Sequence, residues 1–142
     1  MEIREFERGD ACQVLELAKL IFPDFDEQDY LKMMVNKNYL FLVATINSEI
    51  VGFVNFLTID LKLEIIKIGV KPNFRKLGVA TKLIEEMGKY CLKLQKSGIL
   101  LEVNEKNEPA RNLYSKLGFK EIHVRKKYYN YVDDAIIMVK NL

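Results

Sequence analysis

The sequence predicts an α/β fold of the α+β type, in which helices flank a mixed, mainly antiparallel sheet. Several short segments are apolar and bounded by turn residues, whereas others repeat apolar residues at helical spacing. The two kinds of segment follow one another in the order β, α, α, three β, α, β, α and two β. The 142 residues suit one hydrophobic core, so we expect a single domain over residues 1–142.

The N-terminal half is expected to contain a short strand, two helices and a three-stranded meander. Asp10 is placed to cap the first helix, and Gln13 occupies the capping-box position. The meander is predicted because three segments rich in strand-forming residues are joined by short turns. In chain order, the expected elements are strand 2–6, helix 10–21, helix 26–35, and strands 39–46, 50–59 and 62–70.

The C-terminal half is expected to add two helices and three strands. Apolar residues recur at helical spacing from Ala80 onward, which predicts a long helix that ends near Ser97 and Gly98. The next helix has Pro109 in its first turn and Gly118 just past its end, where these residue types are best tolerated. The other expected elements are strand 99–103, helix 108–117, and strands 119–125 and 135–142.

The composition argues against several classes of protein. A net charge of +2 does not support a nucleic-acid binder, which usually carries a broad basic face. No apolar stretch approaches the roughly 20 residues that cross a bilayer, and the N-terminal MEIREFERGD is too charged for a signal peptide. Cys12 and Cys91 lie in helical patterns without a CxxC, so we expect small core residues. The prediction is a cytoplasmic protein with no metal, nucleic-acid or membrane partner.

Positive charge is concentrated where the strand 62–70 leads into the next helix. Five cations and no acid lie from Lys67 to Lys82. A helix N-terminus offers unpaired N–H groups to an anion, and Gly78 would let a ligand approach the backbone. Basic residues on both sides suit a ligand with several phosphates, although a solvated loop with a glycine for its turn predicts the same pattern. The glycine-rich motifs of P-loop and dinucleotide-binding folds are absent.

Three motifs around and after this junction resemble one family. Residues 75–80, RKLGVA, have the form R-x-x-G-x-A, which resembles the acetyl-CoA-binding motif of the GNAT N-acetyltransferases. The stretch LEVNEKNEPARNLYSKLGFKEI resembles the second block of that family. The stretch RKKYYNYVDDAIIM resembles the tail of the subgroup that acetylates protein N-termini, the RimI and Ard1-like enzymes. The resemblance implies a GNAT fold and acetyl-CoA as the cosubstrate.

The resemblance also implies which residues bind acetyl-CoA. The diphosphate would lie against residues 75–80, mainly through backbone N–H groups. The end of the preceding strand would pair with the pantetheine amides, and the N–H of Val70 would face the thioester oxygen. Asn107 matches the asparagine that holds the cofactor or orients a tyrosine, although a helix cap is the alternative. The implied cofactor-binding residues are Ile68, Val70, Arg75, Lys76, Leu77, Gly78, Val79, Ala80 and Asn107.

Glu102 and Tyr114 are the catalytic candidates. Glu102 is an acid in an otherwise apolar strand, and acids are rarely buried without a partner or a function. A strand end with its side chain in solvent is the alternative, and the resemblance implies a general base. Tyr114 matches the general acid of the family, since a phenol of pKa about 10 can return a proton to a thiolate whose thiol has a pKa of about 8.5. Its alternative is a packing residue of an amphipathic helix.

The resemblance implies transfer of acetyl from acetyl-CoA to the N-terminal α-amine of a protein, with a ribosomal protein as one candidate. The first alternative is the same fold acting on a small-molecule amine or a lysine side chain. The second is a non-catalytic acyl-CoA-binding module, against which the presence of both Glu102 and Tyr114 counts. Three tyrosines would line a peptide groove or belong to an exposed edge hairpin, and the oligomeric state is left open. These tyrosines are Tyr128, Tyr129 and Tyr131.

Overall fold

The computed structural model describes residues 1–129 and 132–142, whose strands form one sheet with the order β1-β2-β3-β4-β5-β7-β6. Neighbouring strands are antiparallel except for β4 and β5, which are parallel, so the predicted mixed and mainly antiparallel sheet is confirmed. The strands are β1 (Glu2–Glu5), β2 (Tyr39–Ile46), β3 (Glu49–Ile59), β4 (Lys62–Val70), β5 (Gly98–Asn104), β6 (Lys120–Tyr129) and β7 (Asp133–Asn141). The helices are α1 (Ala11–Ile21), α2 (Glu27–Val35), α3 (Val79–Lys93) and α4 (Glu108–Lys116), with 3₁₀ turns at Arg8–Asp10 and Pro72–Phe74.

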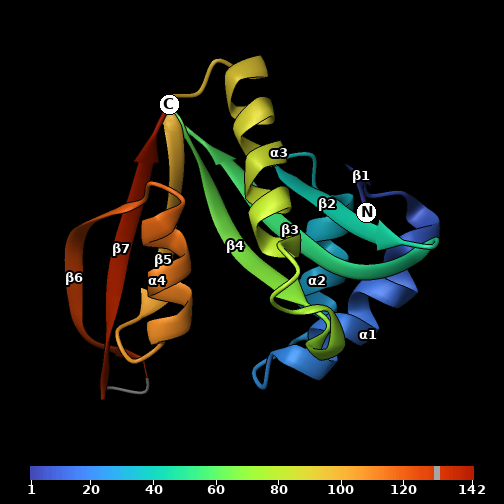
Figure 1. The fold of residues 1–142 in the computed structure, drawn as a ribbon, viewed down its shortest axis with the longest axis horizontal. Coiled ribbons are helices and arrows are strands. Elements are labelled where there is room, and N and C mark those ends of the chain that lie inside the picture. Colours follow the sequence, from blue (N-terminus) through green and yellow to red (C-terminus); the bar gives the residue numbers. More distant parts are fainter. Residues whose placement is uncertain (130–131) are drawn as a thin grey trace.

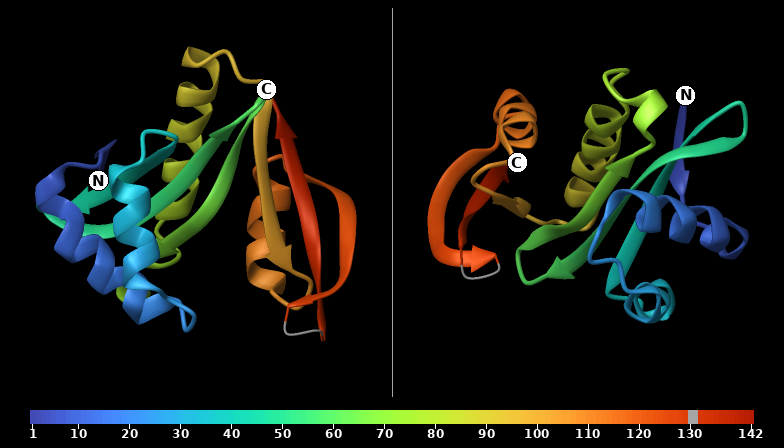
Figure 2. Two further views of the ribbon diagram at one scale, coloured as in Figure 1. Left: turned by 180° about the vertical axis from the view of Figure 1, so that it is seen from behind. Right: turned by 90° about the horizontal axis from the view of Figure 1, so that it is seen from below.

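The helices lie on both faces of the sheet, with α1 and α2 on one face and α3 and α4 on the other (Figures 1 and 2). Under α3 and α4, the fully buried Leu63, Leu83 and Met87 belong to one apolar core. Under α1 and α2, Val14 and Phe53 belong to a second core. Side chains alternate between the two faces along each strand, so the two cores together account for the continuous apolar runs in the central strands.

The strands β4 and β5 are paired only at one end. Three residue pairs join them, from Lys62 and Gly98 to Glu64 and Leu100. Beyond Glu64, β4 stays paired with β3 on its other edge, whereas β5 continues along β7. Figure 1 shows the two strands meeting near the C-terminus and separating toward the opposite end of the molecule. Within the described chain, the second half of β4 is therefore an edge whose backbone groups are available to a ligand.

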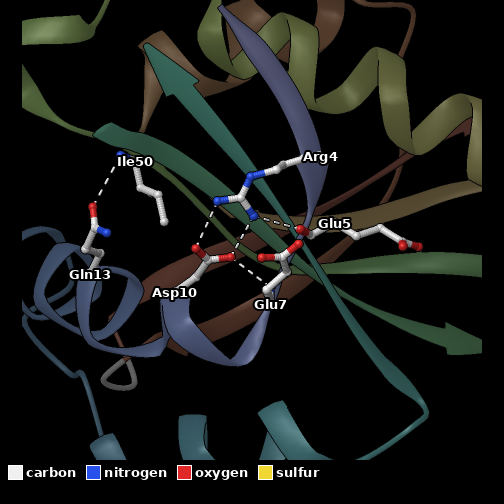
Figure 3. A network of polar contacts seen from close by, with 6 residues as sticks. All are labelled: Arg4, Glu5, Glu7, Asp10, Gln13 and Ile50. Atoms are coloured by element: carbon white, nitrogen blue, oxygen red, sulfur yellow. Dashed lines mark hydrogen bonds and ion pairs between the residues drawn. The ribbon is translucent and has the colours of Figure 1, made fainter. Parts of the chain in front are cut away.

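The Asp10 side chain does not cap α1, contrary to the sequence-based prediction. Its carboxylate accepts hydrogen bonds from Arg4 Nη1 at 2.7 Å, from Arg4 Nη2 at 2.9 Å and from the Glu7 N–H at 2.7 Å. Figure 3 shows it directed at Arg4 on β1. Gln13 is not part of a capping box either, because its Oε1 accepts from the Ile50 N–H at 3.4 Å. A bidentate ion pair, reached only through the tertiary fold, replaces the local cap.

The Arg4–Asp10 ion pair is expected to stabilise the fold. Asp10→Asn should lower the free energy of unfolding by about 2 kcal/mol at neutral pH, because it removes the charge that Arg4 contacts. The hydrogen bond from Arg4 is the largest cause of the lowered pKa of Asp10, and burial opposes it. Because folding lowers this pKa below the ordinary value of 3.8, the stabilisation is complete above that pH and is lost as the pH falls through the folded pKa.

Urea unfolding of the wild type and Asp10→Asn, at about pH 7 and about pH 2, measures this effect. The difference in unfolding free energy between the two proteins should shrink at the lower pH. A difference that is the same at both pH values would show that the charge of Asp10 contributes nothing.

Two other local features differ from the sequence-based predictions. Cys12 is exposed, whereas Cys91 is fully buried as expected. The helix α3 ends at Lys93, about one turn earlier than predicted, and Gly98 begins β5 instead of closing the helix. A Cβ at Gly98 would collide with the carbonyl oxygen of Lys140, so the close passage of β7 requires glycine here.

Candidate active site

A cleft of about 850 Å³ lies where β4 and β5 separate. Its walls come from β4, the loop after it, the first turn of α3, the helix α4 and the end of α1. Most of the predicted site residues meet in this cleft, whereas Leu77 and Glu102 do not line it. Leu77 is 60% exposed, so only its backbone could contribute to the cleft. The predicted residues that line the cleft are Ile68, Val70, Arg75, Lys76, Gly78, Val79, Ala80, Asn107 and Tyr114.

The backbone of β4 directs two of its peptide groups toward the cleft. The Lys71 N–H, just after β4, donates to the carbonyl of Val51 on β3 at 2.8 Å. Lys71 and Val51 are therefore a hydrogen-bonded pair of the ladder. Such pairs alternate along an antiparallel ladder, and the next residues that point away from β3 are therefore Val70 and Ile68. Their N–H and C=O groups face the gap on the β5 side. An extended ligand with amide groups can pair there as a short strand.

The loop between β4 and α3 presents the N-terminus of a helix to the cleft. Gly78 is the N-cap residue of α3 with φ +82°, a left-handed conformation that favours glycine. Within the described chain, no atom beyond its immediate neighbours lies within 4 Å of the position that a Cβ would take. Lys76 is also left-handed, with φ +64°. Left-handed residues before a helix gather backbone N–H groups into a concavity that suits an anion, so this open cradle fits a diphosphate.

Side-chain contacts hold the loop in place. Arg75 Nε donates to the Val70 carbonyl at 3.2 Å, and Lys71 forms an ion pair with Glu49 on β3 at 2.7 Å. The first contact fixes the loop on the end of β4, and the second fixes its start on the neighbouring strand. Two further cations beside the helix start are exposed and add positive charge around the cradle. These are Lys76 and Lys82.

Tyr114 lies on α4 and forms part of the cleft wall. Tyr114 is 8% exposed, and its ring packs against that of Phe119 with 5.7 Å between the ring centres. Burial raises the pKa of Tyr114 to about 12, so the phenol stays protonated at neutral pH. The packing role considered from the sequence is therefore present, and the role of general acid stays a prediction, for a residue that also lines the cleft.

Tyr114→Phe is expected to lower kcat by about tenfold or more while the melting temperature holds, because the ring remains and only the hydroxyl is lost. Rates of the acetyl transfer that the sequence resemblance implies, together with thermal unfolding of the purified variant, measure the two quantities. Phe119→Leu is the matched control, because it changes the residue that packs against Tyr114 and leaves the hydroxyl in place. It should lower the melting temperature and have little effect on kcat. Full activity of Tyr114→Phe would leave only the packing role.

Asn107 is the N-cap of α4, and its Oδ1 accepts from the Ala110 N–H at 3.3 Å. The cap that was considered from the sequence is therefore present. Through this cap, Asn107 fixes the start of the helix that carries Tyr114. Asn107 also lines the cleft. Pro109 in the first turn and Gly118 with φ +95° after the last turn bound α4 as predicted.

Glu102 lies on the face of β5 opposite to α4. Its neighbours Leu101 and Val103 are buried in the core under α3 and α4, so alternation places Glu102 on the other face. The Glu102 side chain is 23% exposed and its Oε1 lies 2.9 Å from Arg125 Nη1. This half-buried acid thus has an ion-pair partner on β6, and its role as a base stays a prediction. Glu102 is reached from the side of α1 and α2, across the sheet from Tyr114.

One acid of the site was not singled out from the sequence. Glu64 is half-buried on β4, and burial raises its pKa, as does the negative charge of Glu102, while Arg125 opposes the shift. Glu64 is also an acid within a strand, but Lys62 and Lys67 on the same strand make its sequence signal weaker than that of Glu102. Several apolar wall residues were also missed, because their spacing is that of ordinary core positions. They include Ile21, Phe22, Phe74 and Leu113.

The tyrosines predicted to line a peptide groove cannot be placed. Tyr131 and the side chains of Tyr128 and Tyr129 lie outside the described part of the structure. The described residues contain no group of three or more histidine, cysteine or acidic side chains placed to hold a metal ion. Among those same residues, no helix is both long enough and apolar enough to span a membrane.

Comparison with known proteins gives this cleft its context. The Acetyltransferase (GNAT) family matches residues 10–119. The N-alpha-acetyltransferase of Sulfurisphaera tokodaii is 29% identical, and the match covers 99% of this chain and 92% of that protein. The ribosomal-protein-S18-alanine N-acetyltransferase from Escherichia coli is 26% identical with a TM-score of 0.89, covering 99% of this chain and 92% of that structure.

A further solved structure is an aminoglycoside 6'-N-acetyltransferase complexed with coenzyme A. Its TM-score is 0.89 at 22% identity, with 99% of this chain and 97% of that structure covered, which establishes likeness of fold. The family match begins directly before α1 and ends three residues after α4, so it includes all of the residues that line the cleft. This chain belongs to the acetyltransferase (GNAT) family.

Proposed function

We propose that this protein transfers the acetyl group of acetyl-CoA to the N-terminal α-amine of a protein. One observation carries the proposal: a single cleft combines the free edge of β4, the open N-terminus of α3 and the protonated phenol of Tyr114. The 29% identity to an N-alpha-acetyltransferase over nearly the whole chain supports an α-amine as the acceptor.

The residues of the cleft fit acetyl-CoA as a substrate. The N–H groups around Gly78 would hold its diphosphate, and the peptide groups of Ile68 and Val70 would pair with the amides of its pantetheine arm. The Val70 N–H would then stabilise the negative charge that develops on the thioester oxygen. Tyr114 would donate its proton to the sulfur as the C–S bond breaks. Burial raises the pKa of the phenol above that of the thiol, so this transfer is uphill by itself. It would be completed when the acetylated nitrogen gives its surplus proton to the phenolate.

Glu102 would act on the acceptor amine. Its carboxylate lies on the opposite face of the sheet, where it would attract the α-ammonium and help remove its proton. Acetyl-CoA and the amine would therefore approach from different faces and meet where β4 and β5 separate. This arrangement keeps the acceptor clear of the phosphate cradle.

The pKa of the amine favours an α-amine over a lysine side chain. An α-amine has a pKa near 8 and a lysine near 10.4, a gap of about 2.5 units or roughly 3 kcal/mol of deprotonation. A carboxylate at the edge of an open sheet can remove the proton of an α-ammonium more readily than that of a lysine ammonium, because the α-ammonium has the lower pKa. A ribosomal protein is one candidate acceptor, and the resemblance to the Escherichia coli enzyme supports it.

A pair of matched peptides tests this proposal. Both carry an internal lysine, and one has a free N-terminus whereas the other is blocked by a formyl group. We expect mass spectrometry to find acetyl on the α-amine of the first peptide and almost none on the second. Equal reaction of the blocked peptide would replace the α-amine by a lysine as the acceptor. Transfer to neither peptide, with turnover of a small amine, would point to a small-molecule acceptor.

A further inference from the structure

Lys67 is the first of the five cations between residues 67 and 82, yet it lies apart from the phosphate cradle. Gly69, two residues later on β4, faces the end of α1, because a Cβ there would meet Ile21 and Phe22. The register with β3 is regular from Lys67 onward, so alternation directs the side chain of Lys67 to that same face. This is the face that α1 and α2 cover (Figure 2), and Lys67 is not among the residues that line the cleft.

The ammonium group of Lys67 is held by an aromatic ring. Its Nζ lies 5.0 Å from the centre of the Phe22 ring, a distance typical of a cation–π contact. Phe22 directly follows α1 and lines the cleft at the end of that helix. Lys67 is exposed, and among residues 1–129 and 132–142 it has no ion-pair partner. A cation that is held in place and unpaired in this way is available to an anionic group of a ligand.

The same face of the sheet carries two acids beside the point where β4 and β5 separate. Leu63 and Ile65 are buried in the core under α3 and α4, so alternation directs Glu64 to the other face, on which Glu102 of β5 also lies. Lys67 is three residues further along β4 than Glu64. This face is therefore negative at the division of the sheet and positive toward α1. An acceptor with a positive amino terminus and a negative charge a short distance along its chain complements both.

We propose that Lys67 is a specificity-determining residue, which binds an acidic side chain at the second or third residue of the acceptor. The proposal rests on the proposed acetyl transfer to an N-terminal α-amine. The amine would react beside Val70, which is three residues from Lys67, or about 10 Å along a strand. An extended peptide covers about 7 Å between its first and third residues. The long side chains of Lys67 and of a glutamate can bridge the rest.

A competition among three peptides tests the proposal. The peptides have a free N-terminus and differ only at residue 2, which is glutamate, glutamine or arginine, and a second set carries the same changes at residue 3. Mass spectrometry of a mixture gives ratios of kcat/KM for the α-amines. In one of the two sets we expect the wild type to favour glutamate over glutamine about threefold, because an exposed ion pair contributes little, and over arginine about tenfold. The preference should shrink between about 0.05 M and about 0.5 M salt.

Substitutions of Lys67 should change this preference in a graded way. Lys67→Met keeps an unbranched side chain against Phe22 without the charge, so the preference should vanish. Lys67→Glu should reverse it in favour of arginine. Lys93→Glu is the matched control, because Lys93 is also exposed and lies over an aromatic ring, with its Nζ 5.8 Å from the ring centre of Tyr90, but it is away from the cleft. It should keep the wild-type preference.

The outcomes separate this proposal from the proposed function. Equal acetylation of the three peptides in both sets, or the same preference in the wild type and Lys67→Glu, would overturn the role of Lys67 and leave transfer to an α-amine intact. A reversal in Lys93→Glu as well would show a general effect of net charge and would also overturn it. Acetylation of none of the α-amines would remove the proposed function, and the role of Lys67 with it.

Discussion

Gly78→Glu is expected to weaken acetyl-CoA binding by more than about a hundredfold while the protein stays folded. The space that a Cβ would occupy at Gly78 is open, and it lies beside the N–H groups at the start of α3. A glutamate there would place bulk and negative charge where the diphosphate docks, so steric exclusion and charge repulsion act together. Isothermal titration with acetyl-CoA measures the affinity.

Gly78→Ala is the matched control for backbone strain. Alanine also has to adopt the left-handed conformation at φ +82°, which costs about 1 kcal/mol, but it adds only a methyl group and no charge. Both variants should therefore lose similar thermal stability, and only the glutamate should lose most of its affinity. Wild-type affinity in a folded Gly78→Glu protein would place the phosphate site elsewhere.

Glu102→Gln is expected to lower kcat by about a hundredfold at neutral pH with little change in acetyl-CoA affinity. The side chain lies across the sheet from the phosphate cradle, so binding of the cosubstrate does not depend on its charge. The amide can still accept a hydrogen bond from Arg125, which preserves the local structure. The deficit should shrink as the pH rises toward about 9.5, because the α-amine then loses its proton unaided.

Initial rates from about pH 6.5 to 9.5, with titrations of acetyl-CoA at each end, measure this profile. Glu16→Gln, an exposed acid on α1, serves as the control and should behave as the wild type. A deficit of Glu102→Gln that does not change with pH would assign the residue to positioning alone, and unchanged rates would remove it from the reaction.

Local patterns predicted most elements of the fold correctly. The apolar spacing from Ala80 identified α3 because burial of one helix face imposes a period of about 3.6 residues. Pro109 and Gly118 bound α4 as expected, since each tolerates its place at a helix end for a backbone reason that needs no tertiary contact. Gly78 does directly precede α3, as its place before the helical pattern predicted, and its role in holding a diphosphate stays a prediction.

The sequence was a poorer guide where distant segments compete for one side chain. Asp10 contacts Arg4 on β1 in place of the helix that follows it, because the tertiary fold offers a bidentate cation. Glu64 and Glu102 are both acids within predicted strands, yet only the register of β4 against β5 sets them on one face beside the division of the sheet. Register between strands of distant segments depends on the whole fold, so the relation between these two acids could not be predicted from local patterns.

Among the described residues, only three residue pairs join the β1–β4 part of the sheet to the β5–β7 part. Backbone pairing at this junction is therefore the weakest in the sheet, and a cooperative local opening of the native protein should start there. A ligand that pairs with Ile68 and Val70 adds hydrogen bonds along this junction and opposes its opening. At a concentration a hundred times its Kd, such a ligand contributes about 2.7 kcal/mol to stability. The cosubstrate would then act as a transient strand that connects the two parts of the sheet.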